Sequence, residues 1–266
     1  MGISYHQETQ LKKRRQFISR TNRVIVSVVI TAGVLGYLLF FAKLFDVRTV
    51  EVRSPSVIST DAIRIKVDDV LNKKYLGIGR RSNIFIFSPQ HIATVLAEEF
   101  PRIASIDIRR TSLHSIAIVI KERVAVGLWC LPVRERCYYF DAHGDSFLEI
   151  LPSSGSIFTP INDFRERRIE IGENVAGSDW RENIFGVKKI LQFGGITVVN
   201  FTIPEDSYDE FQAMTNEGWN ILYSKDINTR RQTDSLLLFL KEKITPEVRT
   251  TLEYVDLRIE DRIYYK

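Results

Sequence analysis

The chain has 266 residues, enough for one large domain or two small ones, and 44% of them are hydrophobic and 26% charged. This composition is ordinary for folded protein, and it excludes wholesale disorder, a collagen-like chain and a protein with many membrane spans. Two cysteines are too few for a disulfide-stapled miniprotein or a four-cysteine zinc module.

The formal net charge of +4 is concentrated at the N-terminus. Residues 1–23 contain six basic residues and one acidic residue, so the rest of the chain sums to about −1. A basic excess would otherwise suggest a nucleic-acid ligand. Because the excess lies in the tail alone, the nucleic-acid interpretation loses its main support.

Residues 24–42 are 19 consecutive uncharged positions between Arg23 and Lys43. A bilayer core needs about 20 such residues in a helix, and a signal-peptide core is shorter and ends at small residues that are absent here. The segment therefore predicts an uncleaved transmembrane helix, in preference to a signal peptide or a buried soluble helix. The segment that flanks a transmembrane helix on the cytoplasmic side is usually the more basic one. We therefore expect the basic N-terminal tail to lie in the cytoplasm and residues 44–266 to be exported.

Cys130 and Cys137 would then lie outside the cytoplasm, where disulfides persist. They flank a turn-like segment that contains Pro132, between two strand-like runs. A disulfide that closes this loop and a pair of free thiols both fit the pattern. The four histidines do not cluster near the cysteines in sequence, so no metal site is expected.

Residues 45–129 predict a first exported domain with the order strand, helix, helix, strand, strand. We expect a strand over Phe45–Val52, a helix capped by Ser59 or Thr60, and a second helix opening at Ser88-Pro89. Alternating isoleucines then predict two strands, through Ile106 and Ile108 and through Ile116, Ile118 and Ile120. This β-α-α-β-β order resembles a POTRA domain, a module that binds polypeptide.

Residues 130–266 predict a second, β-rich domain with packed helices, so the fold class is α+β. We expect a hairpin over 137–147, a loop over 151–166, a short strand at 168–171, and a helix capped by Ser178-Asp179. Strands are expected over 196–203, 208–214 and 219–223, and a last helix over 229–243.

Several motifs, in this order, resemble the FtsQ/DivIB family of bacterial cell division proteins. They are Phe100-Pro101, the run Ile118–Arg123 followed by Trp129, the hairpin Cys137–Phe147, and Tyr254-Val255-Asp256-Leu257-Arg258. The resemblance implies a non-enzymatic scaffold in the plasma (inner) membrane at the septum. It also implies FtsB/DivIC-like and FtsL-like single-span partners, through which the scaffold regulates septal peptidoglycan synthase, and no cofactor.

In that family a partner adds a strand to a late strand of the β-domain, and an unpaired strand edge suits this mode. We therefore expect the partner contacts at the C-terminus. Apolar contacts would come from alternate residues, charges from two arginines and amphipathic anchors from tyrosines. The candidate residues are Leu257, Arg258, Ile259, Arg262, Ile263, Tyr264 and Tyr265. Alternatively, Arg258 pairs within the sheet and the tyrosine rings cover the domain's own core.

Two other classes of function are an exported enzyme and a POTRA-containing envelope component. No G-x-S-x-G, P-loop or H-E-x-x-H motif is present, and the carboxylate pairs Asp68-Asp69 and Glu98-Glu99 lie on the polar sides of predicted helices. An exported enzyme is therefore not expected. A POTRA-containing component of envelope protein transport or assembly is the main alternative, although such proteins usually carry tandem POTRA copies or an outer-membrane barrel.

Overall fold

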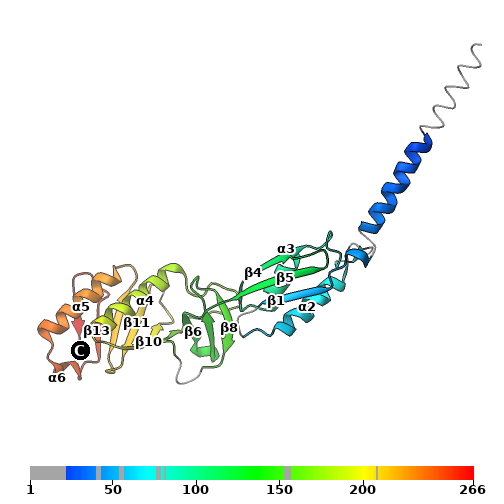
Figure 1. Cartoon of the computed structure of the whole chain (residues 1–266). Coiled ribbons are helices and arrows are strands. Elements are labelled where there is room, and N and C mark those ends of the chain that lie inside the picture. Colours follow the sequence, from blue (N-terminus) through cyan, green and yellow to red (C-terminus); the bar gives the residue numbers. More distant parts are fainter. Residues whose placement is uncertain are drawn as a thin grey trace, which may run out of the picture. The chain divides into compact units, whose positions relative to one another are not determined.

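The computed structural model describes residues 22–39, 43–53, 57–75, 79–80, 82–152, 157–207 and 209–266. Most of the predicted basic tail, residues 40–42 of the predicted span, and Tyr208 of a predicted strand lie outside the described residues. The chain divides into two compact units, residues 1–122 and 123–266. The mixture of helices and sheets confirms the α+β class (Figure 1).

A helix over Asn22–Leu39 occupies most of the predicted span. Among the described residues it is the one helix that is long and apolar enough to cross a membrane. Its large apolar side chains are exposed, as they would be in a helix whose surroundings are lipid.

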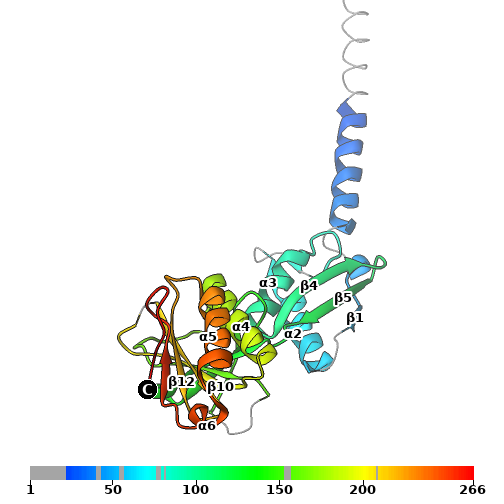
Figure 2. The same cartoon turned by 90° about the vertical axis from the view of Figure 1, so that its left-hand side faces the viewer.

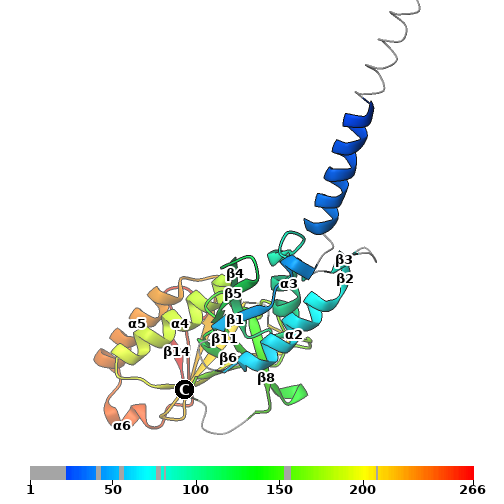
Figure 3. The ribbon, with the colours of Figure 1, turned by 45° about the vertical axis from the view of Figure 1, so that its right-hand side comes forward.

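The first unit contains a three-stranded sheet with the order β1-β5-β4. Strand β1 (Thr49–Arg53) runs parallel to β5 (Ser115–Glu122), and β4 (Ile103–Arg110) runs antiparallel to β5. Helix α2 (Thr60–Asn72) packs against β1, α3 (Pro89–Glu99) against β4, and the helices against each other (Figure 3). Short pieces complete the unit: a 3-10 turn η1 (Lys43–Phe45) and a small hairpin of β2 (Lys74–Tyr75) and β3 (Gly79–Arg80).

The helices of this unit begin where their caps predict. The Ser59 hydroxyl accepts a hydrogen bond from the Ala62 N–H at 3.4 Å, and Ser88 accepts one from His91 at the same distance. The predicted start of the first strand at Phe45 is wrong. Phe45 lies in η1, where its ring meets Phe85 edge-on, and the ladder begins only at Thr49.

The second unit contains a nine-stranded sheet with the order β14-β13-β12-β11-β10-β9-β6-β7-β8. The first half of its chain gives β6 (Gly127–Leu131), a 3-10 turn η2 (Pro132–Arg134), β7 (Arg136–Phe140), β8 (Ser146–Ile150), β9 (Pro160–Asp163) and α4 (Ser178–Phe193). The second half gives β10 (Val198–Ile203), β11 (Glu210–Thr215), β12 (Asn220–Ser224), α5 (Thr229–Lys243), α6 (Pro246–Arg249), β13 (Tyr254–Asp256) and β14 (Tyr264–Tyr265).

Helices α4 and α5 lie side by side over one face of this sheet, next to β10 and β12 (Figure 2). Beneath them lies an aromatic core that includes Trp129, Phe140, Phe211 and Tyr223. The Tyr223 hydroxyl lies 3.1 Å from the Thr233 hydroxyl of α5, and burial raises the pKa of this tyrosine far above its ordinary value.

Three predicted features of this unit are wrong. Strand β9 lies inside the segment 151–166 that was expected to be a loop, and it pairs in parallel with both β6 and β10. Residues 168–171 form no strand, although Ile169 is buried. Helix α4 has Gly177 at its N-cap and begins at Ser178, without a side-chain cap.

Candidate protein-binding site

Strand β14 is the edge of the large sheet, and no described strand pairs with its outer side. Tyr254 and Lys266 exchange both backbone hydrogen bonds, with N···O distances of 3.2 and 3.4 Å. Along an antiparallel strand, the backbone N–H and C=O groups of successive residues point alternately toward and away from the neighbouring strand. Those of Tyr264 therefore point toward Asp256 of β13, and those of Ile263 and Tyr265 point away from β13. The outward N–H and C=O groups form a template for another strand.

The side chains of β14 divide between the two faces of the sheet. The Tyr265 ring is 52% exposed and lies 5.2 Å from the Phe239 ring of α5, centroid to centroid. Ile263 packs partly against the core, whereas Tyr264 is 45% exposed and its hydroxyl accepts a hydrogen bond from Arg262 at 3.3 Å. The edge therefore carries one aromatic ring supported by α5 and one on the opposite face.

Arg258 pairs within the sheet. Its Nε and Nη2 bind the two carboxylate oxygens of Asp256 at 3.0 and 2.7 Å, and its Nη1 binds Glu210 of β11 at 2.8 Å. The hydrogen bond from Arg258 lowers the pKa of Asp256, and the bonds to Asp256 and Glu210 raise the pKa of Arg258. This is the alternative that the sequence left open, and Glu210 was not foreseen from the sequence.

The remaining candidates differ in exposure. Leu257 is only 2% exposed and lies in the core, so it offers no surface to a partner. Ile259 is 51% exposed and precedes a bend in which Asp261 has a φ of 57°. Arg231 of α5 ties this bend by ion pairs to Glu260 and Asp261. Sequence reasoning missed both Arg231 and Phe239, because helical spacing alone does not show which strand end a helix covers.

Cys130 and Cys137 are bonded to each other across β6 and β7, where they are direct cross-strand neighbours. Both side chains are buried, and Tyr139, Ile150 and Phe158 pack against them. The bridge lies on the sheet face opposite Trp129 and Phe140, so it stabilises a second small core and leaves no free thiol at the surface.

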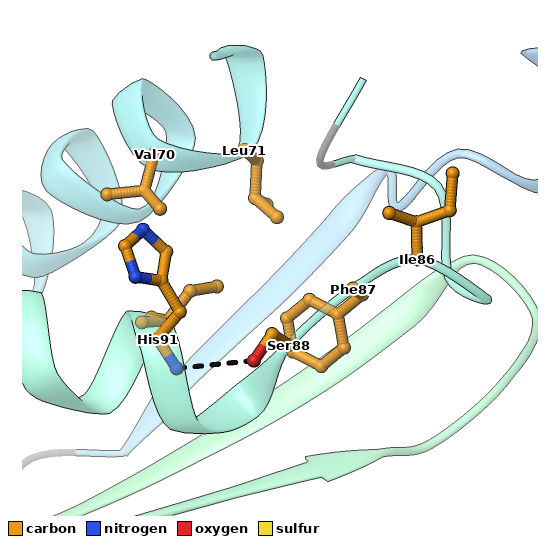
Figure 4. A pocket seen from close by; sticks show the side chains of 7 residues that line it. Val70, Leu71, Ile86, Phe87, Ser88 and His91 are labelled. Carbon is orange, nitrogen blue, oxygen red and sulfur yellow. Dashed lines mark hydrogen bonds between the residues drawn. The ribbon is translucent and has the colours of Figure 1, made fainter. Parts of the chain in front are cut away.

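The first unit has a hollow of its own between α2 and α3, about 280 Å³ in volume. Figure 4 shows Val70 and Leu71 from α2 facing His91, Phe87 and Ile86, with Ser88 bonded to the His91 N–H. Apart from Ser88 and His91 its lining is apolar, and the Ser88 hydroxyl caps α3 by accepting a hydrogen bond from the His91 backbone N–H. Within the described residues no cluster of three metal-ligating side chains occurs anywhere.

Residues 45–123 match the family model described as POTRA domain, FtsQ-type. No curated protein matches the chain. The matched range takes in the β1-α2-α3-β4-β5 arrangement described above. Residues 45–123 are therefore similar to an FtsQ-type POTRA domain, a protein-interaction domain, in a chain that also carries an N-terminal apolar helix and a large β-rich unit.

Proposed function

We propose that this protein is a membrane-anchored scaffold of the bacterial division machinery. Its predicted parts are a cytoplasmic tail (1–23), a membrane anchor (24–42), a POTRA-like domain (45–129) and a partner-binding β-domain (130–266). The FtsQ-type POTRA match is the observation on which this proposal depends most. The C-terminal motif, Tyr254 to Arg258, adds the family resemblance outside the matched range.

The proposed partners are FtsB/DivIC-like and FtsL-like single-span proteins, bound by addition of a strand to β14. The outward backbone groups of Ile263 and Tyr265 support this mode, because main-chain hydrogen bonds give a strand-adding peptide its affinity. Exposed Ile259, Tyr264 and Tyr265 supply side-chain contacts, and Arg262 supplies a charge for an acidic partner group. Through these partners the scaffold would act on septal peptidoglycan synthesis.

The proposal is tested by imaging a fluorescent fusion of the full chain in dividing cells while the native protein is depleted. We expect a band at the constriction, and filaments on depletion. An even membrane signal with normal cell length would contradict the division role. It would favour the alternative of a POTRA-containing transport or assembly component.

The binding edge is tested by Tyr265→Pro. This variant removes the outward N–H without removing a bond to β13, since the Tyr265 N–H faces away from β13. We expect the fusion to reach the septum but to lose co-purification of the partners. Tyr265→Ala is the matched control, because it removes the ring and keeps the N–H. Equal partner recovery with both variants would exclude strand addition at β14.

A further inference from the structure

The buried side chain of Asn83 connects the apolar N-terminal helix to an exposed aromatic residue of the first unit. Its Nδ2 donates a hydrogen bond to the Leu39 carbonyl at 2.9 Å, and its Oδ1 accepts one from the Phe85 N–H at 2.9 Å. Leu39 is the last described residue of the helix. One buried amide therefore fixes the backbone of Phe85 close to the end of the helix.

The contact with Leu39 sets the depth of this loop in the membrane. Leu39 belongs to the predicted span, and the uncharged run continues for three residues beyond it, to Ala42. Three residues extend over at most about 10 Å. A side chain that bonds to Leu39 therefore lies at the level where the chain leaves the hydrocarbon and enters the headgroup region.

A second loop is bonded to the segment that follows the helix. The His114 carbonyl accepts hydrogen bonds from the N–H groups of Arg48 and Thr49, at 2.8 and 3.1 Å. His114 ends the turn between β4 and β5, and Leu113 in the same turn is 56% exposed. Since Thr49 and Ser115 are partners at the first position of the parallel β1–β5 ladder, this turn lies at the end of the sheet where the chain arrives from the helix.

Phe85 and Leu113 are thus two exposed apolar side chains at the membrane end of the first unit. Phe85 is 45% exposed, and exposed Lys43 and Arg48 lie on the segment to which both loops are bonded. Asp46 is the one carboxylate in the sequence of residues 43–49, 82–87 and 111–114. Apolar side chains flanked by cations suit a bilayer interface, where the former enter the acyl boundary and the latter meet lipid phosphates.

We propose that the loops 82–87 and 111–114 dock on the bilayer that the anchor enters. Phe85 and Leu113 insert at the boundary between headgroups and acyl chains, and Lys43 and Arg48 lie beside lipid phosphates. The inference rests on the membrane anchor of the proposed function and deepens it. Docking would hold the POTRA-like domain at the membrane surface, where single-span partners emerge from the bilayer.

The test measures the depth of single labels on the full chain in nanodiscs of phosphatidylcholine and phosphatidylglycerol. The two native cysteines are bonded to each other, so an added cysteine is the one thiol that reacts. Phe85→Cys and Leu113→Cys carry a nitrobenzoxadiazole label, whose emission reports the polarity around it. Val57→Cys is the matched control, because Val57 is 59% exposed and its N–H bonds to Glu122, at the other end of β5.

We expect the emission of the labels at positions 85 and 113 to shift to shorter wavelength. Lipids that are brominated near the top of the acyl chain should quench both labels, because bromine quenches only at short range. The label at position 57 should show neither effect. Labels at positions 85 and 113 that behave like the label at position 57 would overturn the proposal.

A second experiment asks whether the two loops dock together. The Leu113→Cys label is measured with Phe85→Ser and, separately, with Ile65→Ser, which removes a 70% exposed apolar side chain from α2. We expect quenching of the label to fall with Phe85→Ser and to stay unchanged with Ile65→Ser. Equal quenching with the two variants would contradict joint docking.

Flotation of the chain with lipid vesicles separates this inference from the proposed function. A chain that a carbonate wash strips from the vesicles has no anchor, and both proposals then fail. A chain that floats while its labels stay in water keeps the anchor and the scaffold role and loses the docking alone. Docked labels, together with an even membrane signal of the fluorescent fusion, would support the docking and contradict the division role.

Discussion

Arg258 and Asp256 form a two-bond ion pair at the end of β13, with Nε–Oδ1 at 3.0 Å and Nη2–Oδ2 at 2.7 Å. Asp256 is the last residue of β13, and Arg258 follows it two positions later, with buried Leu257 between them. Because Arg258 also binds Glu210 of β11, it connects the C-terminal strand to the middle of the sheet. It therefore positions the chain immediately before the bend that leads into the open edge.

Arg258→Ala should lower the free energy of unfolding by about 1 kcal/mol, because two charged hydrogen-bond partners are lost at a partly exposed site. Arg262→Ala is the matched control, since the Arg262 side chain bonds to the Tyr264 hydroxyl alone among the described contacts. Urea unfolding of the full chain in micelles checks the difference. If Arg258→Ala lowered the free energy of unfolding no more than Arg262→Ala, the connecting role of Arg258 would be contradicted.

Stability should fall in acid partly through Asp256. The folded-state pKa of Asp256 is lowered below its ordinary value of 3.8, chiefly by its hydrogen bond with Arg258. A carboxyl with a depressed folded pKa contributes stability that is present above its unfolded pKa and is lost as pH falls through the folded pKa. The contribution is therefore complete at neutral pH and disappears below about pH 4.

Asp256→Asn should remove this part of the acid dependence. Unfolding free energies of wild type and variant should differ at pH 7 and converge toward pH 2. A constant difference across this range would show that the Asp256 charge contributes nothing. Arg258→Ala should flatten the same part of the profile, since it removes the cause of the pKa shift.

Asp163→Ala should be among the most damaging single substitutions in the second unit. Asp163 is 1% exposed, accepts a hydrogen bond from the Trp129 indole at 3.2 Å, and binds Arg165 at 2.8 Å through each of its two oxygens. Removing one partner of such a pair leaves the other charge uncompensated, and the cost is about 3 kcal/mol. The loss of unfolding free energy is measured by tryptophan fluorescence during denaturant unfolding.

The matched control for Asp163→Ala is Asp107→Ala, which removes a carboxylate from an exposed ion pair with Arg109. It should change the unfolding free energy by less than about 0.5 kcal/mol. Comparable losses in the two variants would mean that burial of Asp163 does not determine its contribution.

Replacing Cys130 and Cys137 together with alanine should destabilise the second unit by about 2–3 kcal/mol, as loop-closure entropy predicts for a short loop. Free-thiol titration of the denatured wild type without reductant should detect no thiol. The variant and the reduced wild type should have the same melting temperature. Two titratable thiols in the unreduced protein would contradict the bridge.

Helices and strands that have one buried face and one exposed face are predicted well from the sequence. The helices α2, α4 and α5 follow from their apolar stripes, and the stripe residues, such as Ile63, Val67 and Ile184, are buried. Strand β5 follows from Ile116, Ile118 and Ile120, which all face the core. In these elements the period of the side chains alone identifies the buried face.

Other elements depend on partners that are distant along the chain. Strand β9 has four residues and begins with Pro160, so its sequence resembles a loop, and only its pairing with β6 and β10 makes it a strand. Residues 168–171 alternate like a strand, but their described contact with β8 is a single hydrogen bond from the Ser146 hydroxyl to the Glu170 carbonyl. The backbone bonds to Ser146 come from Gly172 and Glu173, which follow this segment. Periodicity cannot distinguish a paired segment from one that merely buries a single side chain.

The sequence indicated that the C-terminal segment forms a sheet edge, and β14 is an edge strand of the described sheet, but partner binding there stays a prediction. The burial of Leu257 and the internal pairing of Arg258 could not be predicted, because they depend on the packing of β13 against β12 and on Glu210. The ion pair between Arg231 of α5 and Asp261 of the bend joins residues that are 30 positions apart in sequence. No local pattern predicts such a contact.

The position of β9 also sets an order of events during folding. The antiparallel β6-β7-β8 group and the β10-β11-β12 group each join neighbouring segments, but β9 pairs in parallel with one strand of each group. Hairpins form quickly, whereas contacts between distant segments must first overcome the entropy of closing a long loop. Pulse-labelled hydrogen exchange should therefore show the amides of β9 gaining protection after those of β7 and β11. Until then the two groups would exist as separate small sheets, each with a temporary edge at the seam that β9 later fills.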